Sequence, residues 1–240
     1  MLKIDLHIHT IASGHAQNTI LEFINQAKKL KMKVIGISDH GPGMTGDAIS
    51  YGYFKTLDRM PEIINGIRVL RGIEANIINA NGDLDVGDDI IKHLDYVMAN
   101  VHTPSAYEDG GKEKNTEAFI KAIKSGKINI ITHPTSTRPF ETDLRQICVA
   151  ACDNNVLLEL NLSRLTKRMI KSDTIANIKT MIAIAKKYGK KIILGSDAHN
   201  IWELGDDSLL IPIKKELGLT DDLIINNYPQ ELFQLLKIEK

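Results

Sequence analysis

Short runs of β-branched and apolar residues alternate along this chain with segments that repeat their apolar positions at helical spacing. Seven runs are predicted to be strands, namely Lys3–His9, Lys33–Ser38, Ile67–Glu74, Tyr96–His102, Ile128–His133, Val156–Asn161 and Lys191–Asp197. Strands that alternate with helices imply parallel strands joined by right-handed crossovers. Seven such units in 240 residues favour a single α/β domain over residues 1–240, built as a TIM-like barrel smaller than the eight-unit type.

Several local signals place the helices between these strands. Thr19 and Glu22 form a predicted capping box for a helix that ends near Lys31. Asn115 is expected to cap the helix Glu117–Ser125, which a following glycine closes. The remaining signals are a helix opening at Ser172 or Asp173 and running to Tyr188, a tight turn at Asn81-Gly82, and closing helices in the tail 221–240.

The bulk composition is that of an ordinary globular protein without a global charge. Apolar residues make up 43% and charged residues 25%, and 30 basic residues balance 30 acidic ones, so no field attracts long nucleic acid or an anionic membrane. No run of 18 apolar residues predicts a membrane span. The N-terminus reads directly as a strand rather than a signal peptide, and the only cysteines are Cys148 and Cys152. We therefore expect a cytoplasmic protein, and nothing in the sequence excludes a homo-oligomer.

Seven of the eight histidines lie at or just beyond the C-terminal end of a predicted strand. They are His7, His9, His15, His40, His102, His133 and His199. Catalytic residues of parallel barrels gather at that end, so these side chains are expected to converge on one mouth. Glu74 ends the third predicted strand and Asp197 ends the seventh, positions where an acid is costly unless it is paired or metal-bound. His93 lies in a predicted short helix and receives no ligand role.

The alternation of side chains in the first strand supports this convergence. Asp5, His7 and His9 share one face, and Leu6 and Ile8 share the other, where we expect them to pack against outer helices. A single histidine at a strand end is more often an ordinary core or surface residue than a ligand, but seven at equivalent positions favour a metal site. Imidazole suits zinc, iron, manganese and nickel rather than magnesium or calcium. Nine ligands suit two or three ions, and Glu74 can bridge two of them.

The motifs around these ligands resemble those of the polymerase and histidinol phosphatase (PHP) superfamily, and most closely its stand-alone phosphatase branch. The matching segments run in order through nearly the whole chain, from Asp5-Leu-His-Ile-His-Thr10 and Ser38-Asp-His-Gly-Pro-Gly-Met44 through Arg71-Gly-Ile-Glu-Ala-Asn-Ile77, His102, Asn115-Thr-Glu-Ala118 and Thr132-His-Pro134 to Gly195-Ser-Asp-Ala-His199. This resemblance implies a distorted (βα)7 barrel and three divalent ions, Zn²⁺ with Mn²⁺ or Fe²⁺ as alternatives.

The resemblance also implies a partition of the nine ligands, all of which are present. One ion would be held by His7, His9, Glu74 and Asp197, and the second by Glu74, His102 and His133, with Glu74 bridging. The third would be held by His15, His40 and His199.

These features together predict a hydrolase of small, anionic phosphate monoesters, with nucleotides or short oligonucleotides as further candidates. A metal-activated hydroxide would attack phosphorus, and Glu74 and Asp197 would position it. Arg164, beyond the sixth strand, and Arg138 are candidate phosphate-binding residues. Asp5 and Asp39 are expected to orient ligand imidazoles, although Asp39 could equally be a plain turn residue.

Three alternatives stay open at this stage. A histidinol phosphatase would belong to the same superfamily. An amidohydrolase would share the first-strand His-x-His motif, but many of these enzymes use a lysine on the fourth strand, and Tyr96–His102 contains none. A non-enzymatic, metal-stabilised module would be expected to have lost ligands.

Overall fold

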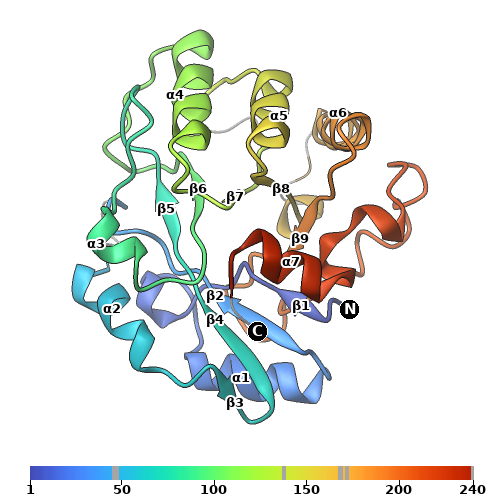
Figure 1. Ribbon diagram of the computed structural model, residues 1–240. Helices are drawn as coiled ribbons and strands as arrows, with labels where there is room; N and C mark the ends of the chain where they lie inside the picture. Colours follow the sequence, from blue (N-terminus) through green and yellow to red (C-terminus); the bar gives the residue numbers. More distant parts are fainter. Residues whose placement is uncertain (45–48, 137–138, 167–169, 171–172, 239–240) are drawn as a thin grey trace.

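The computed structural model describes residues 1–44, 49–136, 139–166, 170 and 173–238, and it has an α/β architecture (Figure 1). The first sheet has the order β1-β2-β4-β3, with β1 at Ile4–Asp5, β2 at Val34–Ile37, β4 at Ile67–Arg71 and β3 at Ile63–Ile64. The second has the order β5-β6-β7-β8-β9, with β5 at Glu74–Asn76, β6 at Met98–Asn100, β7 at Ile130–Ile131, β8 at Leu157–Asn161 and β9 at Ile193–Gly195. All neighbours are parallel except β3 and β4.

Helices lie around these sheets. Their bounds are Ile20–Lys29 for α1, Tyr51–Thr56 for α2, Asp88–Ile91 for α3, Lys112–Lys124 for α4, Leu144–Asp153 for α5, Thr174–Lys187 for α6 and Pro229–Leu235 for α7. Helices α4, α5 and α6 pack in sequence along the outer side of the second sheet, and α1 covers β2 and β4 (Figure 1). No helix within the described ranges is long and apolar enough to cross a membrane.

The sheet hydrogen bonding is interrupted at two places, which we call the seams. The first seam falls at Gly72–Ile73, between β4 and β5, and it is crossed by an isolated bridge between His40 and Glu74. The second seam lies between β1 and β9, and an isolated bridge between Ile8 and Ala198 crosses it. The structure therefore confirms the α/β class with mainly parallel sheets, but the two sheets are joined by isolated bridges and do not form the closed barrel that was expected.

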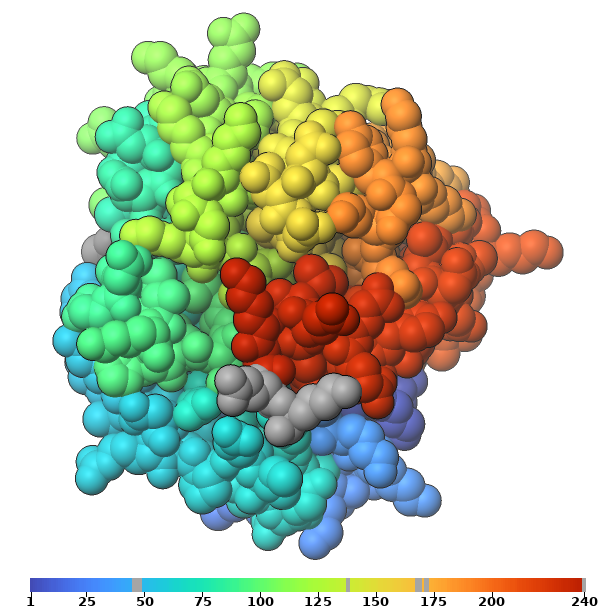
Figure 2. Space-filling view, viewed as in Figure 1, coloured from blue at the N-terminus to red at the C-terminus, as the bar shows by residue number. Residues whose placement is uncertain are grey.

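One apolar cluster draws residues from every parallel strand of the two sheets except β5. Its members are Ile4, Leu6, Val34, Leu70, Tyr96, Met98, Ile130, Leu157 and Ile193, with Ile225, Leu232 and Leu236 from the C-terminal segment. Gly36 and Gly72 leave room for the ring of Tyr96, because a Cβ at either position would overlap it. The Tyr96 hydroxyl donates to the Leu6 carbonyl at 2.6 Å. Helix α7 packs against this cluster, and in Figure 2 the C-terminal segment lies at the centre of the face that is shown.

Two sequence-based expectations about side-chain packing are only partly met. Ile8 packs against α1, as expected, but Leu6 joins the interior cluster beside Tyr96 instead of an outer helix. Ile4 and Leu6 both lie in the interior cluster, as alternation requires, and the alternation breaks between Leu6 and Ile8, beyond the end of regular strand β1 at Asp5. Val97, Ala99 and Val101 do face the outer core, opposite Tyr96 and Met98.

The helix termini show which local signals were reliable. The Thr19–Glu22 capping box is present with both of its hydrogen bonds. Asn115 does not cap a helix, because α4 begins three residues earlier and the Asn115 side chain instead bonds Asp109 and Tyr107. The predicted start of α6 at Ser172 lies outside the described residues, and Asp173 occupies the cap position without a side-chain hydrogen bond.

Candidate metal centre

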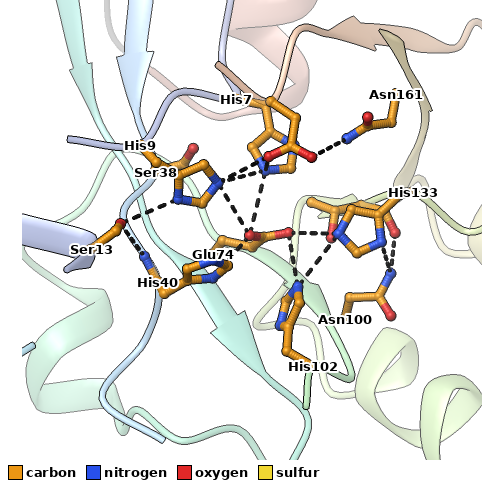
Figure 3. Close-up of polar contacts among 12 residues, drawn as sticks. His7, His9, Ser13, Ser38, His40, Glu74, Asn100, His102, His133 and Asn161 are labelled. Carbon is orange, nitrogen blue, oxygen red and sulfur yellow. Dashed lines mark hydrogen bonds and ion pairs between the residues drawn. The ribbon is translucent and has the colours of Figure 1, made fainter. Parts of the chain in front are cut away.

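All nine predicted ligands lie at one end of the two sheets, where the loops that follow the strands meet. Seven of them line a pocket of about 510 Å³, namely His15, His40, Glu74, His102, His133, Asp197 and His199. His7 and His9 lie fully buried beneath it. Figure 3 shows how the imidazoles of His7, His9, His40, His102 and His133 surround the carboxylate of Glu74. The convergence expected from strand-end placement is thus found.

The first group of converging atoms comes from β1 and β9, across the second seam. His7 Nε2 lies 3.1 Å from His9 Nε2, and Asp197 Oδ1 lies 3.4 Å from the first and 3.3 Å from the second. Two ligand atoms on one tetrahedral ion, each about 2.0–2.1 Å from it, are about 3.3 Å apart. The three side chains are therefore already spaced as ligands of a single ion.

The second group centres on Glu74, at the first seam. Glu74 Oε1 lies 3.1 Å from His133 Nε2 and 3.2 Å from His102 Nε2, and these two nitrogens are 3.4 Å apart. Glu74 Oε2 faces the other way, 3.4 Å from the Nε2 atoms of both His7 and His9. The two oxygens of one buried carboxylate thus face two separate sets of imidazole nitrogens, which is the geometry of a bridging ligand.

The third group is looser and includes His15, His40 and His199. His15 Nε2 lies 2.9 Å from His199 Nε2. His40 can be grouped with His9 and His199, but equally with Glu74 and His102, because its ring lies between the two sets. His40 Nδ1 is buried 3.1 Å from Glu74 Oε2 and makes no hydrogen bond with any residue that the structure describes. A buried nitrogen that faces a carboxylate but has no hydrogen-bond partner is expected where the two groups bind the same cation.

Hydrogen bonds on the outer side of several rings fix which nitrogen faces the centre. Ser13 Oγ donates to Asp39 at 2.6 Å and so must accept from His9 Nδ1, at 3.2 Å. His102 Nδ1 lies 2.8 Å from Asn76 Oδ1, and His199 Nδ1 lies 2.9 Å from the Asp197 carbonyl. Acceptors at Nδ1 leave the Nε2 lone pair free for a metal.

The charges of the site favour a cation. Burial alone would lower the pKa of His7, but the nearby carboxylates of Glu159, Glu74 and Asp197 raise that pKa well above its ordinary value. Burial would raise the pKa of Glu74, but the imidazoles of His102 and His7 hold it well below its usual range. Glu74 is therefore an anion, and its surroundings stabilise positive charge at the position that the imidazoles share.

Other imidazoles are held neutral, which is the form that coordinates metals. Burial, together with His40 and His199, lowers the pKa of His9 well below its ordinary value. Burial and the Arg164 guanidinium likewise lower the pKa of His133. Neutral rings beside an ionised carboxylate form a donor set that suits zinc and similar ions.

A family model for the PHP domain matches residues 5–163, about two thirds of the chain. The chain belongs to the PHP domain family. Of its predicted ligands, Asp197 and His199 lie beyond the matched range. A relative over nearly the full length, the probable phosphatase of Enterobacter sp. strain 638, is 35% identical over 237 residues, covering 99% of this chain and 95% of that protein.

Solved structures share the fold of this PHP domain. One is a histidinol phosphate phosphatase from Lactococcus lactis, complexed with zinc, L-histidinol and phosphate; it has a TM-score of 0.61 and 17% identity, with coverage of 90% of this chain and 94% of that one. Another is the putative histidinol phosphatase of Listeria monocytogenes, with a TM-score of 0.59 and 16% identity, covering 84% and 97%. At these identities the likeness shows the fold alone.

The other residues singled out from the sequence take varied places in this PHP domain. Arg164 follows β8 and lines the pocket, whereas Arg138 lies outside the described residues. Asp5 accepts from the His7 backbone amide at 3.2 Å rather than from its ring. Asp39 is more than a turn residue, because it reaches His9 through Ser13. His93 pairs with Asp58 at the surface, away from the centre.

Sequence reasoning missed two buried carboxylates beside the ligands of the PHP domain. Glu159 on β8 lies 2.6 Å from His7 Nδ1. Asp85 accepts from the Asn76 side chain at 2.6 Å, and Asn76 in turn contacts His102. Glu159 carried a usable signal, since it is an acid within the apolar strand Leu157–Asn161, the same criterion that selected Glu74 and Asp197. Asp85 lies in a loop and carried none.

Proposed function

We propose that the chain is a metal-dependent phosphoesterase that hydrolyses small organic phosphate monoesters in the cytoplasm, and that residues 1–240 form one domain. The observation that carries the proposal is Glu74, whose two oxygens face separate sets of histidine nitrogens. Membership of the PHP family and a relative that is a probable phosphatase support the phosphoester class. The two sheets would together correspond to a distorted (βα)7 barrel, since one interior cluster contains residues from every parallel strand except β5.

Three divalent ions are proposed for the nine ligands, with Zn²⁺ favoured by the imidazole-rich donor set. Such ions would lower the pKa of a coordinated water toward neutrality and would neutralise charge on the phosphoryl oxygens. Three ions carry six positive charges, and Glu74, Asp197 and the adjacent Glu159 return three, so the loaded site would hold about +3. That charge, at the base of an open pocket, suits a phosphate dianion.

The residues of the chain have separable tasks in this proposal. Glu74, at the first seam, and Asp197, at the second, would fix the relative positions of the ligand groups. The attacking hydroxide and the phosphate would then be bound at a fixed distance from each other. His7 and His9, fully buried, form the floor of the site. Arg164 lines the pocket near His133, and its buried Nε has no hydrogen-bond partner within the part of the chain that the structure describes. A guanidinium with an unused donor can hold phosphate oxygens.

Replacing Arg164 by alanine should lower kcat/KM for a phosphate monoester by about 10- to 100-fold, since a hydrogen bond to a charged group contributes about 1.5–3 kcal/mol. The loss should fall mainly on KM, because a guanidinium that binds the phosphate contributes to substrate binding and Arg164 is not one of the predicted metal ligands. Steady-state kinetics with a chromogenic monoester measures it. Arg145→Ala, on the exposed side of α5, is the matched control. Equal kinetics in both variants would remove Arg164 from the substrate site.

The function itself is tested by metal content and substrate range measured together. Purified protein is reconstituted with Zn²⁺, Mn²⁺ or Fe²⁺, its ions are counted by elemental analysis, and it is assayed against phosphate monoesters, nucleotides, short oligonucleotides and cyclic amides. We expect two to three ions per chain and phosphate release from at least one monoester. Fewer than two ions per chain, or amide turnover without phosphate release, would refute the proposal.

A further inference from the structure

Strand β8 and the short 3-10 helix that follows it contribute none of the predicted ligands, yet their side chains contact His7, His133 and Asp197. Glu159 and Asn161 lie in the C-terminal half of β8, and Ser163 lies two residues further on, in the 3-10 helix Leu162–Leu165. Asn161 Nδ2 lies 3.2 Å from Asp197 Oδ2, and Ser163 Oγ donates to the same oxygen at 3.0 Å. These contacts indicate that β8 positions the ligands supplied by its neighbours.

Glu159 is the centre of this arrangement. Its side chain is fully buried, and each carboxylate oxygen has a different task. Oε1 lies 2.6 Å from His7 Nδ1, and Oε2 accepts from the His133 backbone amide at 2.7 Å and from Asn161 Nδ2 at 3.1 Å. Gly195 on β9 makes the space for it, because a Cβ there would overlap Oε1.

The bond to His7 has a chemical consequence. A carboxylate only accepts hydrogen bonds, so His7 must donate from Nδ1 and present Nε2 to the centre. That Nε2 is the atom that faces His9, Glu74 and Asp197. A carboxylate behind a ligand imidazole also makes the ring a stronger donor to a metal.

The bond to His133 acts through the backbone. His133 has a φ of +30°, a left-handed conformation that a non-glycine residue adopts only when its surroundings hold it there. The Glu159 carboxylate accepts from the amide of this residue, and the His133 ring then reaches Glu74 Oε1. One side chain thus contacts a ligand of each of the two groups that Glu74 connects.

We propose that Glu159 is a positioning residue that selects the coordinating tautomer of His7 and holds the His133 backbone, so that the two ligand groups on either side of Glu74 are organised together. The inference rests on the proposed metal-binding function. It predicts that losing Glu159 weakens two metal sites at once, although Glu159 itself touches no ion.

The test compares Glu159→Gln and Glu159→Ala with wild type. Zn²⁺ affinities are measured by chelator competition, and the absorption spectrum of the Co²⁺-loaded protein reports ligand geometry. Alanine removes both contacts, so we expect about 10- to 100-fold weaker binding of two ions, the usual effect of losing an outer partner of a ligand. Glutamine can accept from His7 but then turns its NH₂ toward the His133 amide, so we expect an intermediate loss and a shifted Co²⁺ spectrum.

Asp95→Asn is the matched control, because Asp95 is a partly buried carboxylate paired with Arg71 away from the centre. It should lower thermal stability and leave metal affinities and spectrum unchanged. Wild-type affinities and an unshifted Co²⁺ spectrum in both Glu159 variants would overturn the inference while leaving the function intact. If wild type itself binds fewer than two ions, the proposed function fails first. If the alanine variant does not fold, the glutamine variant decides by the same two measurements.

Discussion

Glu74→Gln is expected to reduce phosphate release by more than about 100-fold, beyond the 10- to 100-fold range typical of residues that only support a ligand. Glutamine keeps the size of the side chain but removes its charge and one of its two acceptor oxygens, so it cannot serve both ligand groups. The imidazoles of His102 and His7 would also lose the anion that they surround. Steady-state kinetics under saturating Zn²⁺, together with elemental analysis, measures both effects.

The control for this substitution is Glu117→Gln, at an exposed ion pair with Lys121 on α4. Exposed pairs of this kind contribute little to stability, so activity and metal content should match wild type. We expect the Glu74 variant to retain fewer ions than wild type at equal total metal. Full metal content and wild-type turnover in Glu74→Gln would contradict the assignment of Glu74 as the bridge.

Removal of the ions with a strong chelator should abolish activity and lower the melting temperature. A ligand that binds only the folded state stabilises it by about 2.7 kcal/mol when present at 100 times its Kd, which for a chain of this length corresponds to about 5–10 °C for each ion. Differential scanning calorimetry before and after chelation measures the shift.

The reversal of this treatment makes the prediction specific. Adding Zn²⁺ or Mn²⁺ back should restore both the melting temperature and phosphate release, whereas Mg²⁺ or Ca²⁺ should restore neither, because the donor set is rich in imidazole. An unchanged melting temperature after complete chelation would show that the histidines are satisfied without metal.

The sequence was sufficient to predict which residues meet, because parallel strands bring their C-terminal ends to one edge. His15 and His199 are 184 positions apart, yet their Nε2 atoms lie 2.9 Å from each other, and placement at strand ends predicted this proximity from local patterns alone. The Thr19–Glu22 box was equally readable, since its two hydrogen bonds are made within four residues. The exclusion of His93 followed from the same rule.

What the sequence could not supply are features that depend on exact register and on partners distant in the chain. Glu159 contacts His7 across 152 positions, and only the relative height of β8 and β1 decides that contact. His40 shows the same limit, because its ring can be grouped with either of two ligand sets, and strand-end placement carries no information about which. The Asn65-Gly66 turn between β3 and β4, by contrast, is a hairpin signal visible in the sequence, and the prediction did not include the strand β3 that precedes it.

Because the proposed metal ligands lie at the two seams, metal binding should also affect how firmly the two sheets are joined. At the first, the chain itself continues through Gly72–Ile73, and the His40–Glu74 bridge with its neighbouring backbone bonds also joins the sheets. At the second, the Ile8–Ala198 bridge and the hydrogen bond from the Ser196 amide to Asp5 join them. Each bridge lies among residues that we propose as ligands. Ions bound there would add coordination bonds at both places where the sheet ladder is interrupted. Binding of the metal ions would then complete the connection between the two sheets. Hydrogen exchange of the Gly41 and Ala198 amides should therefore slow more when metal binds than exchange of the amides within β8.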